Sequence, residues 1–320
     1  MQRLCLSDMG SISVIVPTCN RAANLPGLIE ALLDQDYRGD FEVIVVDNAS
    51  TDNTAAVLER YCRRERGVRW IRETRRGAAQ ARNAGARAAR GDILAFVDDD
   101  VVPARDWLRT MAAVFEEYPE VDCAGGRVEA EWLAPPPEWL TPLNYPPLAL
   151  QLSRGGSAEY LDATNASSCL ISANFAIRKR VLDEAGGFSA DYRRDEDREL
   201  NLRLWSLGKR GKYVGAARAR AIVQPERLTK RYHRRWYHVT GANHARMRFR
   251  EIVDRDGRLV PPSRGPLILG APRFLYRLLL DSATRWLRAA LRRRGPEMFR
   301  AECDLRYYLS YIAARRRQGA

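Results

Sequence analysis

The sequence predicts an α/β protein with a mixed, mostly parallel β-sheet flanked by helices, followed by a basic helical C-terminal region. In the first 120 residues, short runs of apolar and β-branched residues alternate with segments whose leucines and alanines recur at helical spacing. Such alternation is typical of parallel sheets covered by helices on both faces. The chain has 320 residues and a net charge of +13, and most of the positive surplus lies late in the chain.

The pattern places each element in order. Strands are expected at about 11–16, 42–46, 68–71 and 92–97, because these runs are short, apolar and rich in valine and isoleucine. Helices are expected at about 25–33, from 54, at 78–89 and at 104–118. The segment 131–147 holds six prolines and three aromatic residues, which favours a loop or linker. A helix is expected from about 196, and a long basic one at 229–250.

Composition limits where the protein can act. No uncharged run reaches the roughly 18–20 residues that a membrane-spanning helix needs, and residues 1–10 lack the apolar core of a signal peptide. The six cysteines form no C-x-x-C pair, so a reducing compartment is the simpler interpretation. We therefore expect a cytoplasmic protein, either soluble or peripheral at the inner membrane face. The positive charge suits a polyanionic partner such as nucleic acid, acidic lipid headgroups or a phosphorylated substrate.

Polar residues follow the predicted strands, where open α/β sheets bind their ligands. We expect four such clusters to line one crevice. They are Pro17, Thr18, Asn20 and Arg21; Asp47 and Asn48; Arg82 and Asn83; and Asp98, Asp99 and Asp100.

The acidic triplet 98–100 carries the most information. Three adjacent carboxylates repel one another, and a hard divalent cation such as Mg²⁺ or Mn²⁺ would relieve that repulsion. Such a cation could also neutralise a leaving diphosphate. An acidic, solvated turn is the alternative. A second acidic group, Glu196 and Asp197, begins a predicted helix; it could deprotonate an acceptor hydroxyl or simply favour the helix start through the helix dipole.

Seven motifs in order resemble the family 2 inverting glycosyltransferases with the GT-A fold, over roughly residues 12–241. They are VIVPTCNR (14–21), VVDNASTD (45–52), ARNAG (81–85), FVDDD (96–100), SANFAIR (172–178), GGF (186–188) and EDREL (196–200). Each motif is modest alone, and their order and spacing make the set specific. The resemblance implies a catalytic domain at 1–250 and a basic helical region at 251–320.

The resemblance also implies roles. Pro17, Thr18, Asn20 and Arg21 would line the nucleotide pocket, Asp47 would bind the base beside Asn48, and Arg82 and Asn83 would lie near the base and phosphates. Asp98 and Asp100 would form the D-x-D pair that touches ribose and metal, with Asp99 between them. Asn174 and Phe175 would shape the sugar and acceptor pocket. Asp197 would be the catalytic base, with Glu196 contacting the acceptor.

Two departures from the family pattern matter. Many relatives carry a metal-binding histidine after the last core strand, where this chain has Ala221. The histidines at 233, 238 and 244 are expected to be structural or exposed. The sequence Arg234-Arg235-Trp236 is similar to the Q-x-x-R-W motif of processive synthases, but Tyr232 replaces the glutamine. We therefore expect a non-processive enzyme, in which Arg235 could still help hold the diphosphate.

The expected reaction is a single in-line displacement with inversion at the anomeric carbon. Its expected setting is cell-surface glycan synthesis. The donor would be a UDP-sugar or else a GDP- or dTDP-sugar. The acceptor would be a hydroxyl, with a lipid-linked saccharide among the candidates. Three alternatives stay open: a sugar nucleotidyltransferase, a nucleic-acid-binding protein, and a catalytically impaired relative. The first lacks the glycine-rich loop that would seat a triphosphate, and the second lacks any recognised binding motif, so no specific nucleic acid is expected.

The segment 272–294 is an amphipathic helix candidate. Leu275, Leu278, Leu279, Trp286 and Ala290 lie on one side, and arginines lie on another. Such a helix could rest on an anionic membrane surface. Alternatively, its apolar side could pack on the protein itself.

Overall fold

The computed structural model describes residues 11–152, 159–262 and 265–318. Residues 1–10, predicted not to be a signal peptide, lie outside these ranges. By its internal contacts the chain forms two compact units. The first comprises the residues up to 130 together with 151–222, and the second comprises 131–150 together with the residues from 223 onward.

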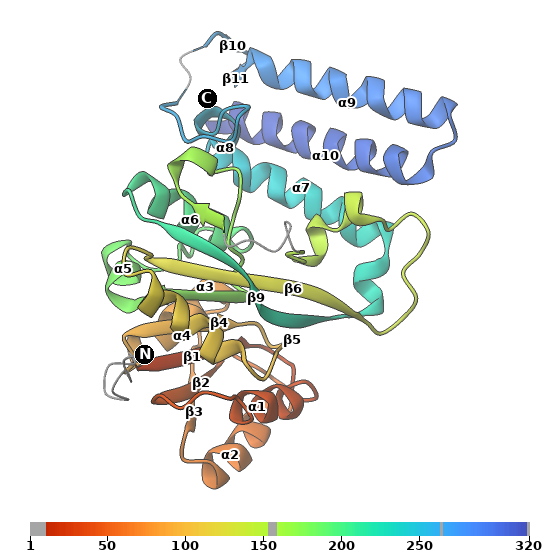
Figure 1. Cartoon of the computed structure of the whole chain (residues 1–320). Helices are drawn as coiled ribbons and strands as arrows, with labels where there is room; N and C mark the ends of the chain where they lie inside the picture. The colour runs from red at the N-terminus through yellow and green to blue at the C-terminus, as the bar shows by residue number, and fades with distance from the viewer. Residues whose placement is uncertain (1–10, 153–158, 263–264, 319–320) are drawn as a thin grey trace. The chain divides into compact units, whose positions relative to one another are not determined.

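The first unit contains the predicted parallel sheet (Figure 1). Its parallel strands are β1 (Ile12–Thr18), β2 (Phe41–Asp47), β3 (Val68–Arg72) and β4 (Ile93–Val97), in the order β3-β2-β1-β4. Thr18 lies opposite Asp47 where β1 and β2 end. The four parallel strands therefore deliver their following loops to one edge of the sheet, as the sequence predicts.

The connecting helices are α1 (Leu25–Leu33), α2 (Thr54–Arg64), α3 (Ala78–Ala88) and α4 (Trp107–Glu117). Each forms because its apolar residues recur on one face; in α1, Leu25, Leu28, Ile29 and Leu32 are all buried. Gly85 of α3 faces Ile15 and Val46, so the absence of a side chain allows this helix to approach the sheet closely.

An antiparallel extension makes the sheet mixed. Beyond β4 the order continues β8-β6-β9-β5, and β7 pairs with β9. These strands are β5 (Val101–Pro103), β6 (Cys123–Trp132), β7 (Glu159–Leu161), β8 (Asn174–Arg178) and β9 (Gly211–Val223). The helices of this part are η3 (Ala163–Asn165), α5 (Lys179–Glu184) and α6 (Glu196–Ser206). Because β8 runs antiparallel to β4, its first residue, Asn174, lies opposite Val97.

The second unit is helical. It contains η1 (Pro142–Asn144), η2 (Pro146–Leu148), η4 (Pro225–Leu228), α7 (Lys230–Arg246), α8 (Phe249–Ile252), β10 (Leu267–Ile268), β11 (Ala271–Pro272), α9 (Arg273–Leu291) and α10 (Gly295–Gln318). α10 packs against both α7 and α9 and lies between them (Figure 1). The hydrophobic core of this unit includes Tyr237, Leu275, Phe299 and Tyr311.

The division between the units differs from the boundary expected at residue 250. α7 and the proline-rich segment group with the C-terminal helices because Tyr237 and Ala245 of α7 share a core with α10. His233 and His244 are buried there, with His244 Nδ1 2.8 Å from Tyr307 Oη. Among the described helices, none is long and apolar enough to cross a membrane.

Candidate functional site

Three loops that follow parallel strands are tied together at one edge of the sheet. Asn20, which has a positive φ of 56°, accepts a hydrogen bond from the Thr51 backbone at 2.7 Å. The Asn20 backbone donates to Ser50 Oγ at 2.9 Å. Asn48 donates to the carbonyl of Arg75 at 2.8 Å and accepts from the Gly77 backbone at 2.7 Å. The first two clusters predicted from the sequence, around Asn20 and around Asn48, thus converge.

Asp47 offers a free acceptor inside this edge. Its side chain is fully buried, and Oδ1 accepts a hydrogen bond from the Ser50 backbone at 2.9 Å. Oδ2 is also buried and has no hydrogen-bond partner among the described residues. A buried acceptor without a donor is costly, so this atom is suited to a ligand that supplies an N–H or O–H.

The acidic triplet continues from β4 and is held from β1. Thr18, next to Pro17 in β1, donates from Oγ1 to Asp99 Oδ2 at 2.8 Å, and Arg21 Nε lies 4.0 Å from Asp99 Oδ1. Burial raises the pKa of Asp99 to about 7, and the charges of Asp100 and Asp98 add to the increase. The site therefore concentrates negative charge that its own residues only partly neutralise.

Arg82 joins the triplet to the start of α6. Its Nη2 donates to Asp98 Oδ1 and its Nη1 to Glu196 Oε1, both at 2.6 Å, and the guanidinium lies 5.5 Å from the centre of the Phe188 ring. Burial disfavours its charge, but Asp98 and Glu196 outweigh burial, and the pKa of Arg82 is raised. Its neighbour Asn83 uses both amide atoms on the Phe188 backbone, each at 2.8 Å.

The predicted sugar-pocket residues are held firmly. Asn174 accepts from Trp107 Nε1 at 2.8 Å and donates to the carbonyls of Arg127 at 3.0 Å and Ala217 at 2.9 Å. Phe175 is 1% exposed. These contacts fix the start of β8. Both amide hydrogens of Asn174 are therefore engaged in hydrogen bonds within the protein.

Asp197 lies in the first turn of α6. Its Oδ1 accepts from the Arg198 backbone at 2.8 Å, and its Oδ2 from the Ser172 backbone at 3.4 Å. Burial raises the pKa of Asp197 to about 6, with further increases from the charges of Glu196 and Asp195. A carboxylate with a raised pKa is a better proton acceptor than an ordinary aspartate.

Ala221 occupies the position at which the family resemblance led us to expect a metal-binding histidine. It pairs with Val101, and the next residue, Ile222, donates from its backbone to the carbonyl of Asp100 at 2.8 Å. Position 221 is therefore beside the triplet, but the methyl side chain of alanine has no atom that could bind a metal. Among the described residues, no three His, Cys, Asp or Glu side chains converge in a metal-binding group.

Glu73 is a buried carboxylate that the sequence reasoning did not single out. It follows β3, accepts from the Arg75 backbone at 2.8 Å, and donates its own backbone N–H to the carbonyl of Asp47 at 2.9 Å. Its only sequence signal is its place as the first acidic residue after a predicted strand.

Arg235, which the sequence suggested as a diphosphate contact, is an exposed residue of α7 and belongs to the second unit.

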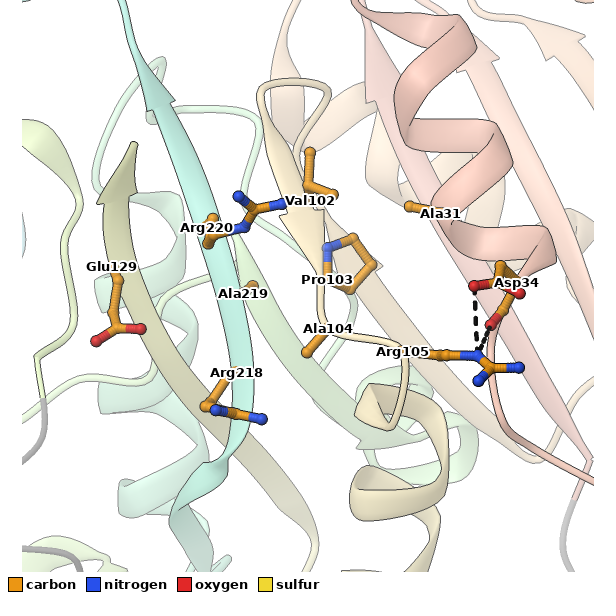
Figure 2. Close-up of a pocket in the computed structure, with 10 residues that line it drawn as sticks. All are labelled: Ala31, Asp34, Val102, Pro103, Ala104, Arg105, Glu129, Arg218, Ala219 and Arg220. Atoms are coloured by element: carbon orange, nitrogen blue, oxygen red, sulfur yellow. Dashed lines mark hydrogen bonds and ion pairs between the residues drawn. The ribbon is translucent and has the colours of Figure 1, made fainter. Parts of the chain in front are cut away.

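A separate hollow of about 370 Å³ lies elsewhere on the first unit (Figure 2). Its lining includes Pro103, Glu129 of β6 and Arg218 of β9, and the ion pair between Arg105 and Asp34, with N and O 3.3 Å apart, marks one side. It shares no residue with the site predicted from sequence.

Comparison with known proteins decides the family. The model of glycosyl transferase family 2 matches residues 13–186, more than half of the chain. The chain belongs to glycosyl transferase family 2. The matched range contains Asp47 and Asp98 and ends before Asp197.

Two relatives illustrate the sequence similarity. An uncharacterised glycosyltransferase of Haemophilus influenzae is 31% identical over 60% of this chain and 61% of its own length. The glucosyl-dolichyl phosphate glucuronosyltransferase of Haloferax volcanii is 24% identical over 59% of each chain. This chain thus spans less than two thirds of the length of these relatives.

Solved structures support the GT-A fold. The mannosyltransferase PcManGT of Pyrobaculum calidifontis, in complex with GDP-Man and Mn²⁺, has a TM-score of 0.62 at 22% identity, covering 97% of this chain and 88% of its own. Residues 1–349 of Staphylococcus aureus TarS, in complex with UDP, have a TM-score of 0.54 at 19% identity, covering 97% and 92%. At these identities the likeness establishes the fold.

Proposed function

We propose that this chain transfers a sugar from a nucleoside-diphosphate sugar to a hydroxyl group, with inversion at the anomeric carbon and one sugar added per encounter. The observation that carries the proposal is the convergence of three unlike groups on one unit. These are the unpartnered buried acceptor of Asp47, the partly neutralised triplet 98–100, and the Asp197 carboxyl with its raised pKa.

The donor's nucleotide would be bound at the loops that follow β1 and β2. Asp47 Oδ2 is buried and lacks a donor, and the imide N–H of uracil, or the N–H groups of guanine, would satisfy it. Asn20, Asn48 and Thr18 would maintain the loop geometry through their hydrogen bonds to the neighbouring loops and to Asp99. A UDP-sugar is the first candidate, with GDP- and dTDP-sugars as the others.

A divalent cation fits the donor set of the triplet, which consists of carboxylate oxygens alone. Mg²⁺ usually takes one or two protein carboxylates and completes its shell with phosphate and water, so two ligands, Asp98 and Asp100, would suffice without a histidine at position 221. Bound there, Mg²⁺ or Mn²⁺ would neutralise charge on the departing diphosphate. PcManGT, a structural neighbour, forms a complex with GDP-Man and Mn²⁺.

Asp197 would accept the proton of the acceptor hydroxyl. Its Oδ1 and Oδ2 are oriented by the backbone N–H groups of Arg198 and Ser172. Glu196 would face the acceptor while fixed by Arg82. We assign Arg82 to bridging Asp98 and Glu196 and fixing their positions, since both arms of its guanidinium are engaged.

The acceptor would be a hydroxyl of a glycan or of a lipid-linked saccharide. The dolichyl-phosphate substrate in the name of the Haloferax relative supports the second class. A role in cell-surface glycan synthesis is consistent with either acceptor class. The relative TarS is named a poly(ribitol-phosphate) beta-N-acetylglucosaminyltransferase, which supports a polymeric acceptor.

The direct test replaces Asp197 with asparagine, which keeps the shape and removes the base. Release of nucleoside diphosphate from a panel of UDP-, GDP- and dTDP-sugars with a mixed hydroxyl acceptor should fall by about a hundredfold to ten-thousandfold. The matched control is Asp183→Asn, a change at an exposed aspartate of α5. Unchanged turnover by Asp197→Asn would remove Asp197 from the base role.

A further inference from the structure

The amphipathic helix α9 has two apolar faces, and its own unit buries one of them. Leu275 is fully buried in the helical core, and Leu278 and Leu279 pack against that core. These are the leucines that the sequence suggested for a membrane surface. They pack on the protein itself, as the alternative interpretation held.

The second face of α9 points away from this core. Leu280, Leu287 and Leu291 are spaced by seven and four residues, so they form one line along the helix. They are 66%, 54% and 77% exposed. The line lies opposite the buried line of Leu275, Ser282 and Ala289. A helix that only packs on its own domain needs one apolar face, so this second line calls for a partner.

The β10–β11 hairpin extends the same surface. Leu267, Ile268 and Leu269 are 60%, 43% and 67% exposed. Tyr276 of α9 donates from Oη to the carbonyl of Ile268 at 2.9 Å, which holds the hairpin beside the first turns of the helix (Figure 1). We call these six side chains the outer apolar surface: Leu267, Ile268, Leu269, Leu280, Leu287 and Leu291.

Arginines border the outer apolar surface on α9. Arg288 and Arg292 each directly follow a leucine of the line, and Arg277 lies one turn before Leu280; all three are exposed. Among the described residues none of the three forms an ion pair that would neutralise it, and Asp281 is the one acidic residue of α9. The surface is therefore apolar along its centre and cationic along its border.

Charge selects among the partners that could cover such a surface. A second copy of the chain would place arginine borders against each other, which is repulsive. A nucleic acid would use the arginines and leave the six apolar side chains in water. An anionic bilayer satisfies both features, because phosphate headgroups pair with the arginines while the leucines enter the acyl boundary.

We propose that the outer apolar surface docks on anionic membrane lipid. α9 would lie in the plane of the interface, and the hairpin would insert beside it. The inference does not depend on the chemistry of the first unit, since it involves residues of the second unit alone.

Vesicle sedimentation of the full 320-residue chain tests this proposal. Vesicles of equal parts phosphatidylcholine and phosphatidylglycerol should carry the protein down, and vesicles of phosphatidylcholine alone should bind it far less. The triple change Leu280→Ser, Leu287→Ser, Leu291→Ser should weaken binding by at least about tenfold. Its matched control is Leu133→Ser, Leu207→Ser, Leu309→Ser, which alters leucines that are 54%, 52% and 55% exposed elsewhere, and this control should bind as the parent does.

A second pair of variants tests the charged border. Arg277→Gln, Arg288→Gln, Arg292→Gln should lose about fivefold in binding per arginine, on the phosphatidylglycerol vesicles only. The matched control, Arg64→Gln, Arg66→Gln, Arg90→Gln, removes the same charge from exposed sites of the first unit and should change binding much less.

Vesicle binding by the leucine variant at the parent level would overturn the proposal. So would a dimer, seen by light scattering without lipid, that the leucine variant abolishes. Nucleotide binding should be the same in every variant, which separates failure here from failure of the proposed transferase function.

Discussion

At the scale of single residues, the sequence predicted which side chains lie close together, and the structure adds the partners with which each side chain interacts. The clusters around Asp47 and Asp98 converge because parallel strands end at one sheet edge. The pairing of Arg82 with Glu196, 114 positions apart, depends on tertiary packing that no local pattern contains. For the same reason the sequence did not show that the Asn83 amide and the amide hydrogens of Asn174 form hydrogen bonds with backbone groups.

Arg82 should be a determinant of stability as well as of the site. Arg82→Met would leave Asp98 and the buried Glu196 without their shared cation, and removing one partner of a buried ion pair costs about 3–5 kcal/mol. We expect the free energy of unfolding in urea to fall by about 3 kcal/mol. Arg90→Met, at an exposed position just beyond α3, should have little effect, and equal losses in the two variants would contradict this role.

The pH dependence of transfer should report Asp197. Its carboxyl, with a pKa raised to about 6 by burial and by Glu196 and Asp195, accepts a proton only while it is ionised. Arg82 and the Arg198 backbone act in the opposite direction. As pH falls through about 6, kcat/KM should begin to decline, approaching a tenfold loss for each further unit. A profile that stays flat down to pH 4.5 would rule out a base with this pKa.

At the scale of elements, the strands and helices before residue 118 follow the apolar pattern of the sequence, with the exception of the short strand β5, which the sequence did not predict. β6 and α10 do not follow it either. β6 contains Gly125 and Gly126, which weaken a strand pattern. A Cβ at Gly126 would collide with the carbonyl of Ala217 and with Asn174, so close packing requires the glycine. α10 begins at Gly295-Pro296. In the sequence, this pair indicates a break between helices, although proline is well suited to the first turn of a helix.

Two helical glycines form a matched pair that tests the packing of α3. In Gly85→Ala the new methyl group would meet Ile15 and Val46, and overpacking of this kind costs about 1–3 kcal/mol. In Gly27→Ala the methyl group enters open space within α1, so the substitution should stabilise by up to about 1 kcal/mol. Urea unfolding of the two variants measures both effects. Shifts of the same sign would contradict the close contact of α3 with the sheet.

At the scale of the whole molecule, the sequence predicted the fold and its basic C-terminal helices, but it placed the boundary at residue 250. The compact units divide at 130, 150 and 222, because α7 shares its aromatic core with α10. That grouping depends on tyrosines and a phenylalanine distributed over 75 residues, from Tyr237 to Tyr311 by way of Phe299. Local hydrophobic patterns cannot show which of two cores such residues join.

The central claim is that the first unit binds a nucleoside diphosphate with the help of a divalent cation. Calorimetric titration of the chain with UDP, GDP and dTDP, each with and without Mn²⁺, measures this directly. We predict that one of the three binds, that Mn²⁺ strengthens the binding, and that the double change Asp98→Asn, Asp100→Asn removes the effect of Mn²⁺. Absence of binding by all three nucleotides, with or without Mn²⁺, would contradict the account.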